Sequence, residues 1–184
     1  MSLPVVLVPG FATSAARTWG DNGWLDLLAD IGRTPVPLDV LGSGSADKPH
    51  DPAAYVDMEE ELLPRVPDGP VDAVGFSNGA RTLLVLAARH PERFRSLILA
   101  GVGRNLFERD ATSERIASAI DGTGDVDDPT VRYFVQLSQA PDQDPLALAA
   151  FMRRQRSFEM TPESLAPITC PVLVVLGDRD FVGP

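Results

Sequence analysis

The chain has 184 residues, of which 44% are hydrophobic and 23% charged, proportions that exclude a disordered or fibrous protein. This length is enough for one domain with a sizeable core. The formal net charge of −10 disfavours nucleic acid as a partner, because binding to phosphates requires clustered Lys and Arg.

The sequence also bears on location and cofactors. No apolar run approaches the length of a membrane span, and the start lacks the basic region of a signal peptide, so we expect a cytoplasmic protein. The single cysteine, Cys170, cannot form an internal disulfide and is expected to be a small buried apolar residue. We recognise no cluster of metal ligands and no phosphate-binding loop, and we expect neither a metal nor another cofactor.

The first predicted strand is the apolar run from Leu3 to Val8, which ends at Pro9-Gly10. A continuously apolar run suits a parallel strand that is buried on both faces. The segment from Asp21 to Ile31 is predicted to be a helix that ends at Gly32. Its apolar stripe consists of Trp24, Leu25, Leu27, Leu28 and Ile31.

The second predicted strand, Thr34 to Val40, contains two prolines. Backbone N–H groups at positions i and i+2 point to the same side of a strand, so Pro35 and Pro37 both remove donors from one side. We therefore expect this strand to lie at the edge of the sheet. Because little sequence precedes residue 3, the prolines also agree with the expectation of a genuine N-terminus. A loop over 42–50 follows, and then a predicted helix from Asp51 to Leu63, with Asp51 as N-cap and Glu59, Glu60 and Glu61 on the solvated side.

The most informative stretch is a strand, Val71 to Phe76, followed by Ser77-Asn78-Gly79 and a strong helix-forming segment that ends near His90. Gly75-x-Ser77-x-Gly79 also occurs in ordinary turns, but the strand before it and the helix after it favour a sharp strand-to-helix turn. We expect strained backbone at Ser77 and expect the two glycines to avoid Cβ collisions. The N–H of Asn78, at the helix N-terminus, would point at an oxyanion beside Ser77.

This stretch resembles the nucleophile elbow of the α/β-hydrolase family, and the resemblance covers essentially the full length. It implies that Ser77 is a nucleophile. The turn Pro9-Gly10-Phe11-Ala12 is similar to the turn that supplies a second oxyanion donor, here the N–H of Phe11, although Pro9 stands where His is usual. The alternative is a plain turn with Phe11 as a core aromatic.

Residues 104–166 lack strand signals, and helices are predicted over 113–120, 130–139 and 146–158. The insertion of this segment after a fourth strand, Ser96 to Gly101, resembles the cap of many family members. Phe151, Met152 and Phe158 either line an acyl pocket or dock the cap on the core. Three nearby arginines are expected on a solvated face: Arg153, Arg154 and Arg156.

The fifth predicted strand, Cys170 to Gly177, leads to Asp178-Arg179-Asp180. By resemblance, Asp180 is the acid that orients a catalytic His, with Asp178 as the competing candidate. The family's order is Ser, acid, His, yet no His follows Asp180. His90 is expected at the far end of the elbow helix, and His50 in a loop that is not the usual place of the base.

Two expectations follow from the end of the chain. We expect a family member cut before its last strand, last helix and catalytic His. The apolar fifth strand would then form an open sheet edge that promotes self-association.

The predicted fold is therefore α/β, a doubly wound parallel sheet of about five strands in the order 2-1-3-4-5, in a single domain with core 1–103 and 167–184 and a helical cap over 104–166. The resemblance implies a serine hydrolase of small carboxylic esters or related acyl compounds, impaired here by the missing His. Two alternatives remain open, namely a non-catalytic binding protein on the same fold and a Ser-dependent lyase or acyltransferase.

Overall fold

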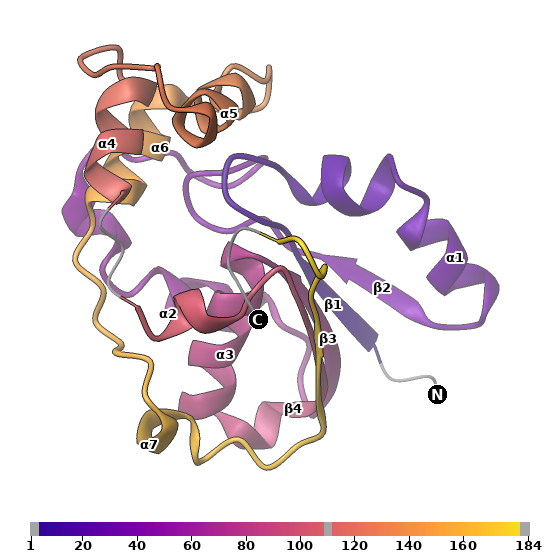
Figure 1. Ribbon diagram of the computed structural model, residues 1–184. Helices are drawn as coiled ribbons and strands as arrows, with labels where there is room; N and C mark the ends of the chain where they lie inside the picture. The colour runs from indigo at the N-terminus through magenta and orange to yellow at the C-terminus, as the bar shows by residue number, and fades with distance from the viewer. Residues whose placement is uncertain (1–3, 109–111, 181–184) are drawn as a thin grey trace.

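The computed structural model describes residues 4–108 and 112–180 and contains a five-stranded sheet in the order β2-β1-β3-β4-β5 (Figure 1). Every pair of neighbouring strands is parallel. The predicted sheet order is confirmed. The strands are β1 (Pro4–Val8), β2 (Thr34–Pro37), β3 (Val71–Phe76), β4 (Phe94–Ala100) and β5 (Val172–Val175).

Seven α-helices accompany this sheet in the described part of the chain. They are α1 (Trp24–Asp30), α2 (Met58–Leu62), α3 (Asn78–Arg89), α4 (Ser113–Ile120), α5 (Pro129–Ser138), α6 (Pro145–Arg153) and α7 (Pro162–Leu165). Short helical turns precede α1, over Ala16–Gly20, and flank α2, over Pro52–Tyr55 and Leu63–Arg65.

Three predicted helices are shorter than expected, and the one predicted over residues 21–31 spans only Trp24–Asp30. The helix predicted over residues 51–63 is broken, because Asp57 leaves helical geometry at φ −119° and ψ 36°, although Asp51 does cap its first turn by accepting from the Ala53 N–H at 2.9 Å. The helix predicted to reach Phe158 ends at Arg153, since Arg154 turns to extended backbone and donates to the Phe151 carbonyl oxygen at 2.7 Å. One predicted solvent-facing residue, Glu59, is only 6% exposed.

The side chains of β1 alternate between two apolar layers, as expected for a strand buried on both faces. Val6 and Val8 pack in the larger cluster with α2 and α3, whereas Val5 and Leu7 pack with Trp19, Leu25 and Leu28 on the other face. Helix α3 therefore lies against one face of the sheet and α1 against the other. Leu25 and Leu28 are the part of the predicted α1 stripe that packs inward.

The remainder of the predicted apolar stripe is exposed. Trp24, Leu27 and Ile31 all project into solvent. Figure 1 shows α1 at the periphery of the molecule, beside β2. The helix thus packs on the sheet with a narrow side and leaves Trp24, Leu27 and Ile31 47–65% exposed.

The two sheet edges differ in chemistry. The Leu38 N–H donates to the Leu7 carbonyl oxygen of β1 at 3.0 Å. Because backbone nitrogens alternate between the two sides of a strand, the nitrogens of Pro35 and Pro37 face away from β1, as predicted. At the opposite edge, β5 pairs with β4 on one side, and its four residues are 43–56% exposed. Cys170, just before β5, is half-buried against the core, and burial raises the pKa of its thiol.

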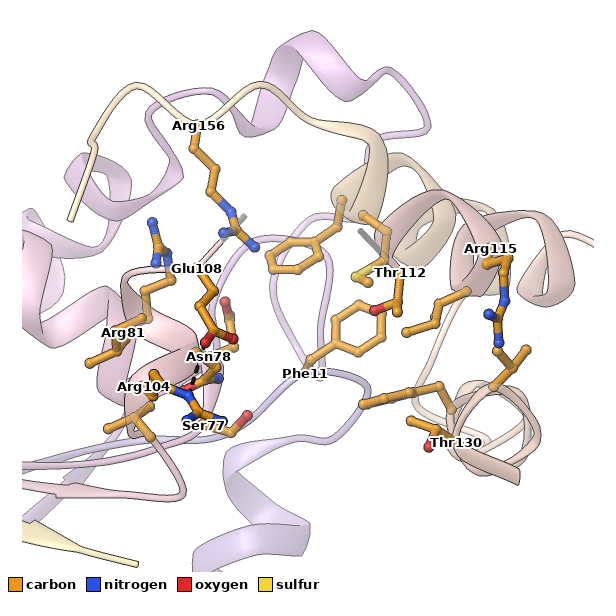
Figure 2. Close-up of a pocket in the computed structure, with 18 of the residues that line it drawn as sticks. Phe11, Ser77, Asn78, Arg81, Arg104, Glu108, Thr112, Arg115, Thr130 and Arg156 are labelled. Atoms are coloured by element: carbon orange, nitrogen blue, oxygen red, sulfur yellow. Dashed lines mark ion pairs between the residues drawn. The ribbon is translucent and has the colours of Figure 1, made fainter. Parts of the chain in front are cut away.

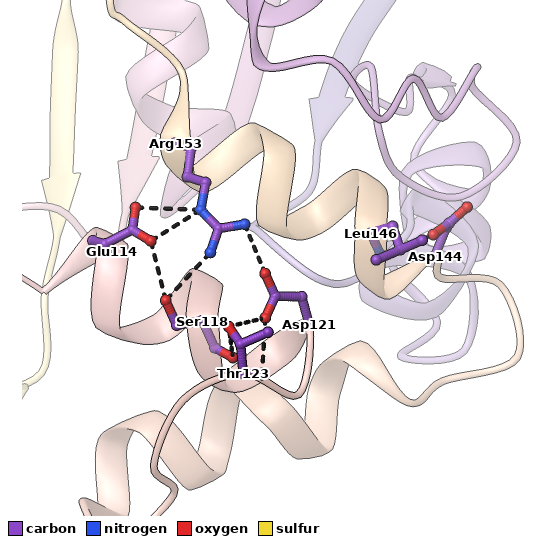
Figure 3. A network of polar contacts seen from close by, with 7 residues as sticks. All are labelled: Glu114, Ser118, Asp121, Thr123, Asp144, Leu146 and Arg153. Carbon is purple, nitrogen blue, oxygen red and sulfur yellow. Dashed lines mark hydrogen bonds and ion pairs between the residues drawn. The ribbon is translucent and has the colours of Figure 1, made fainter.

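Helices α4, α5 and α6 gather at one end of the molecule (Figure 1) and share a small apolar cluster around Ile116, Ala117 and Leu148. Arg153 joins α6 to α4 (Figure 3), where it contacts Asp121 at 2.7 Å and Glu114 at 3.0 Å. The prediction of a solvated face is wrong for Arg154, which is buried with its guanidinium 3.6 Å from the Phe151 ring centre. Within the described ranges, no helix has both the length and the apolar character to cross a bilayer.

Candidate active site

Ser77 stands at the junction between β3 and α3 in backbone that L-residues rarely adopt. Its φ is 52° and its ψ is −111°. The Ser77 N–H donates to the Ala100 carbonyl at 2.7 Å, and the Ser77 carbonyl accepts from the Arg81 N–H at 3.1 Å. These bonds anchor the strained residue to β4 and to the first turn of α3. The predicted backbone strain at Ser77 is confirmed.

Two glycines permit this turn. A Cβ at Gly75 would lie 2.6 Å from the Ala80 Cα, so β3 and α3 could not close together. A Cβ at Gly79 would lie 2.2 Å from the Val8 carbonyl oxygen. Gly79 therefore allows α3 to approach the end of β1 rather than β3. The sequence pattern did not reveal this contact with β1.

A cavity of about 580 Å³ opens beside Ser77. Its lining brings together three residues singled out in the sequence: Ser77, Asn78 and Phe11 (Figure 2). Asn78 is the first residue of α3, where backbone N–H groups have no acceptor within the helix. The Asn78 Nδ2 atom is itself buried without a hydrogen-bond partner among the described residues.

One wall of the cavity is aromatic and apolar. The Phe11 ring centre lies 5.1 Å from that of Phe151 and 5.7 Å from that of Phe134. Phe151 and Met152 line the cavity, which agrees with the acyl-pocket interpretation. Phe158 instead packs against the core, and the Arg89 guanidinium carbon lies 5.5 Å from the centre of its ring. Phe158 therefore follows the docking interpretation.

The lining of the cavity is also rich in arginine, which sequence reasoning missed. Arg81, Arg104, Arg115 and Arg156 all contribute to it. Arg156 is exposed, as expected, and it also contributes to the lining of the cavity, which was not expected. The position of Arg81 could have been anticipated, because a residue four positions after Ser77 on the same helix lies one turn away.

Neither histidine belongs to the lining of the cavity. His50 Nε2 lies 2.9 Å from Asp144 Oδ2, at the residue that caps α6. His90 Nε2 lies 2.9 Å from Glu60 Oε2, beyond the C-terminal end of α3. Burial opposes ionisation of Glu60, yet hydrogen bonds from Arg89 and His90 outweigh it and lower the pKa of Glu60.

The two candidate acids follow β5 in a tight turn. The Asp180 N–H donates to the Gly177 carbonyl at 3.1 Å. Asp180 is half-buried and Asp178 is exposed, and neither lines the cavity. The described structure thus assembles Ser77, Phe11 and Asn78 around one cavity but leaves Asp180 outside its lining.

The strand–serine–helix turn beneath a partly apolar cavity defines a class of hydrolases, and sequence comparison agrees. Residues 4–120 match the model of the α/β hydrolase fold family. The chain belongs to that family. It is an esterase-like hydrolase by this membership and by the relatives it resembles.

The chain is similar to a pimeloyl-[acyl-carrier protein] methyl ester esterase of Neisseria meningitidis serogroup B, with 29% identity over 194 residues, covering 90% of this chain and 73% of that protein. It is also 30% identical over 104 residues to the 2-hydroxymuconate semialdehyde hydrolase of Pseudomonas sp. strain CF600, covering 53% of this chain and 36% of the relative.

Solved structures support the same fold. Rv0554 from Mycobacterium tuberculosis superposes with a TM-score of 0.73 at 19% identity, covering 100% of this chain and 75% of that one. The 2-hydroxy-6-oxo-6-phenylhexa-2,4-dienoate hydrolase BphD from Rhodococcus sp. strain RHA1 gives 0.69 at 21% identity, with 100% and 75% coverage.

Proposed function

We propose that the chain is a serine hydrolase of carboxylic esters or related acyl compounds that acts through an acyl-enzyme on Ser77. The observation that carries this proposal is the left-handed φ of 52° at Ser77, on the lining of the cavity. Strained backbone of this kind is retained where surrounding structure enforces it and where it serves a site. It holds the hydroxyl at the tip of the turn, where an ester carbonyl can reach it.

The proposed oxyanion donors are the backbone N–H groups of Phe11 and Asn78. Both residues line the cavity with Ser77, and Ala12, next to Phe11, also has a positive φ of 56°. Two N–H donors aimed at one position would stabilise the negative charge that develops on the carbonyl oxygen as Ser77 attacks. Residues 104–166 would act as the cap, since Ile116, Phe134 and Met152 contribute to the same cavity.

We further propose that this 184-residue chain turns over slowly because it has no catalytic base at Ser77. Neither His50 nor His90 belongs to the described lining of the cavity, so neither is placed to take the Ser77 proton. Loss of one triad member removes most of the gain from the triad but leaves a residual acceleration of about 10³–10⁴ over water.

Chemical rescue tests the missing base directly. Exogenous imidazole should increase hydrolysis of p-nitrophenyl acetate by the chain, and subtraction of the Ser77→Ala variant removes the reaction in free solution. His50→Ala should leave the rescued rate unchanged. A fluorophosphonate probe should label the unsubstituted chain in the presence of imidazole and should not label Ser77→Ala. Fast turnover without imidazole that His50→Ala abolishes would make His50 the base and refute the proposed impairment.

The role of the acid needs a version extended by a segment that supplies the histidine. In that version Asp180→Asn should lower kcat about 10⁴-fold, as expected when the imidazole loses its orienting carboxylate. Asp178→Asn, an exposed neighbour in the same turn, should have a much smaller effect. Equal losses in the two variants, or a larger loss for Asp178→Asn, would contradict the assignment of Asp180.

A non-catalytic binding protein is the second candidate, and the position of both histidines outside the described lining of the cavity favours it. Fluorophosphonate labelling distinguishes the two functions. A binding protein would show no covalent labelling of Ser77 even with imidazole present.

A further inference from the structure

The described lining of the cavity differs in charge from the chain as a whole. It contains four arginines, Arg81, Arg104, Arg115 and Arg156, and two acids, Glu108 and Asp128. The complete chain instead carries 26 acidic and 16 basic residues. A basic concave site on an acidic protein attracts anions locally and excludes cations, because the walls focus the electrostatic field.

The arginines are distributed unevenly around the cavity. Arg115 pairs with Asp128 at 2.6 Å, and Figure 2 shows Arg115 and Thr130 on the side away from Ser77. Arg81 and Arg104 lie on the Ser77 side, where Arg104 pairs with Glu108 at 2.9 Å. That second pair is well exposed to solvent, so water screens it strongly.

The position of Arg81 relative to Ser77 is fixed by the first turn of α3. Arg81 belongs to that turn, and its N–H donates to the Ser77 carbonyl at 3.1 Å. The Arg81 guanidinium donates to the Phe158 carbonyl at 3.4 Å, a long hydrogen bond that a charged ligand could replace. Arg156 reaches the cavity from the segment that follows α6, so the two arginines come from separate parts of the fold.

The structure points to a more specific substrate class: we propose that the cavity takes an ester whose acyl chain carries a carboxylate, bound by Arg81 and Arg156. The planar guanidinium matches a carboxylate with two parallel hydrogen bonds. The short apolar chain between carboxylate and ester would pack on the Phe11 and Phe151 rings. The position of the ester rests on the proposed function, whereas the charge preference follows from the lining alone.

Binding to the Ser77→Ala chain tests this preference without any need for turnover. The charged probe is monomethyl adipate, and its neutral isostere is the monomethyl ester of adipic monoamide. Each is titrated by ligand-observed NMR at pH 7, where the carboxylate is ionised. A charge-assisted pair should make the charged probe bind at least about tenfold more tightly, and added salt should reduce the difference.

Arginine variants then locate the preference. In the Ser77→Ala background, the double variant Arg81→Gln with Arg156→Gln should bind both probes equally. The control is Arg132→Gln, on the exposed side of α5, which removes one positive charge outside the cavity and should keep the preference. Circular dichroism establishes that each variant is folded.

Equal binding of the two probes, or a preference that survives the double substitution, would overturn the inference. Either result leaves the proposed function in place if the fluorophosphonate probe still labels Ser77 in the unsubstituted chain. A charge preference without covalent labelling would instead support the inference and contradict the acyl-enzyme, so the two proposals fail separately.

Discussion

Ser77 holds a conformation that costs free energy, and the surrounding bonds to Ala100 and Arg81 maintain it. A non-glycine residue at positive φ brings its Cβ close to the following carbonyl, at a cost of about 1–3 kcal/mol. The fold therefore sacrifices stability to present this one hydroxyl at the cavity. The cost belongs to the Cβ rather than to the hydroxyl, and the two can be separated by substitution.

We expect Ser77→Gly to raise the free energy of unfolding by about 1 kcal/mol relative to Ser77→Ala, because glycine relieves the strain and alanine retains it. Urea denaturation of the two variants measures the difference. Neither variant has the hydroxyl, so the comparison isolates the backbone. Equal stabilities would show that the turn is relaxed at Ser77 and would weaken the case for an enforced site.

Asp72 connects two strands and the loop before β2 through a single carboxylate. It accepts hydrogen bonds from Arg33 and Arg95 and, at 2.6 Å, from the Ser96 hydroxyl. Burial raises the pKa of Asp72, but the bonds from Arg95, Ser96 and Arg33 together outweigh burial and hold that pKa below its ordinary value. The folded state therefore stabilises the ionised carboxylate.

The sign of the pH effect follows from this depressed pKa. The stabilisation is fully present above the unfolded-state pKa of about 3.9 and is lost as the pH falls through the lower, folded-state value. Asp72→Asn should cost about 1.5–3 kcal/mol at pH 7, as expected for charge-assisted hydrogen bonds. The difference from the unsubstituted chain should shrink in the acid range.

Thermal unfolding from pH 7 down to pH 2 measures this convergence. Asp68→Asn, an exposed residue in the same region, is the control and should track the unsubstituted chain at every pH. A constant difference between Asp72→Asn and the unsubstituted chain across that range would show that Asp72 acts through packing rather than through its charge.

The strands and the elbow were predictable because their signals are local. Apolar runs of four to eight residues identified β1, β3 and β5, and the paired glycines around Ser77 identified the turn. The break before α2 was not predicted, and Asp57 there contacts Arg89 and Ser157, which are distant in the sequence. The early end of α6 was also missed, although Arg154 makes only local contacts there with Phe151, three residues before it. The arginine-rich lining was missed because its arginines come from segments that are distant in the sequence and meet only in the folded chain.

In the described part of the molecule, the two edges of the sheet are unequally protected against pairing with another chain. At the β2 edge, Pro35 and Pro37 present no N–H groups to an incoming strand. At the β5 edge the four residues are Val172, Leu173, Val174 and Val175, all apolar and all well exposed, and Ile98 of β4 beside them is 38% exposed. An apolar strand with one open side pairs readily with another chain.

We expect the 184-residue chain to self-associate by pairing of β5 between copies, in spite of its net charge of −10. Val174→Lys places a charge on that strand and should shift sedimentation velocity profiles toward the monomer. The exposed face of α1 offers a matched comparison, since Trp24→Lys removes an apolar side chain of another unprotected surface and should leave association unchanged. If Trp24→Lys disperses the chain while Val174→Lys does not, the contact runs through α1. A stable monomer whose β5 amides resist hydrogen exchange would show that the β5 edge is covered.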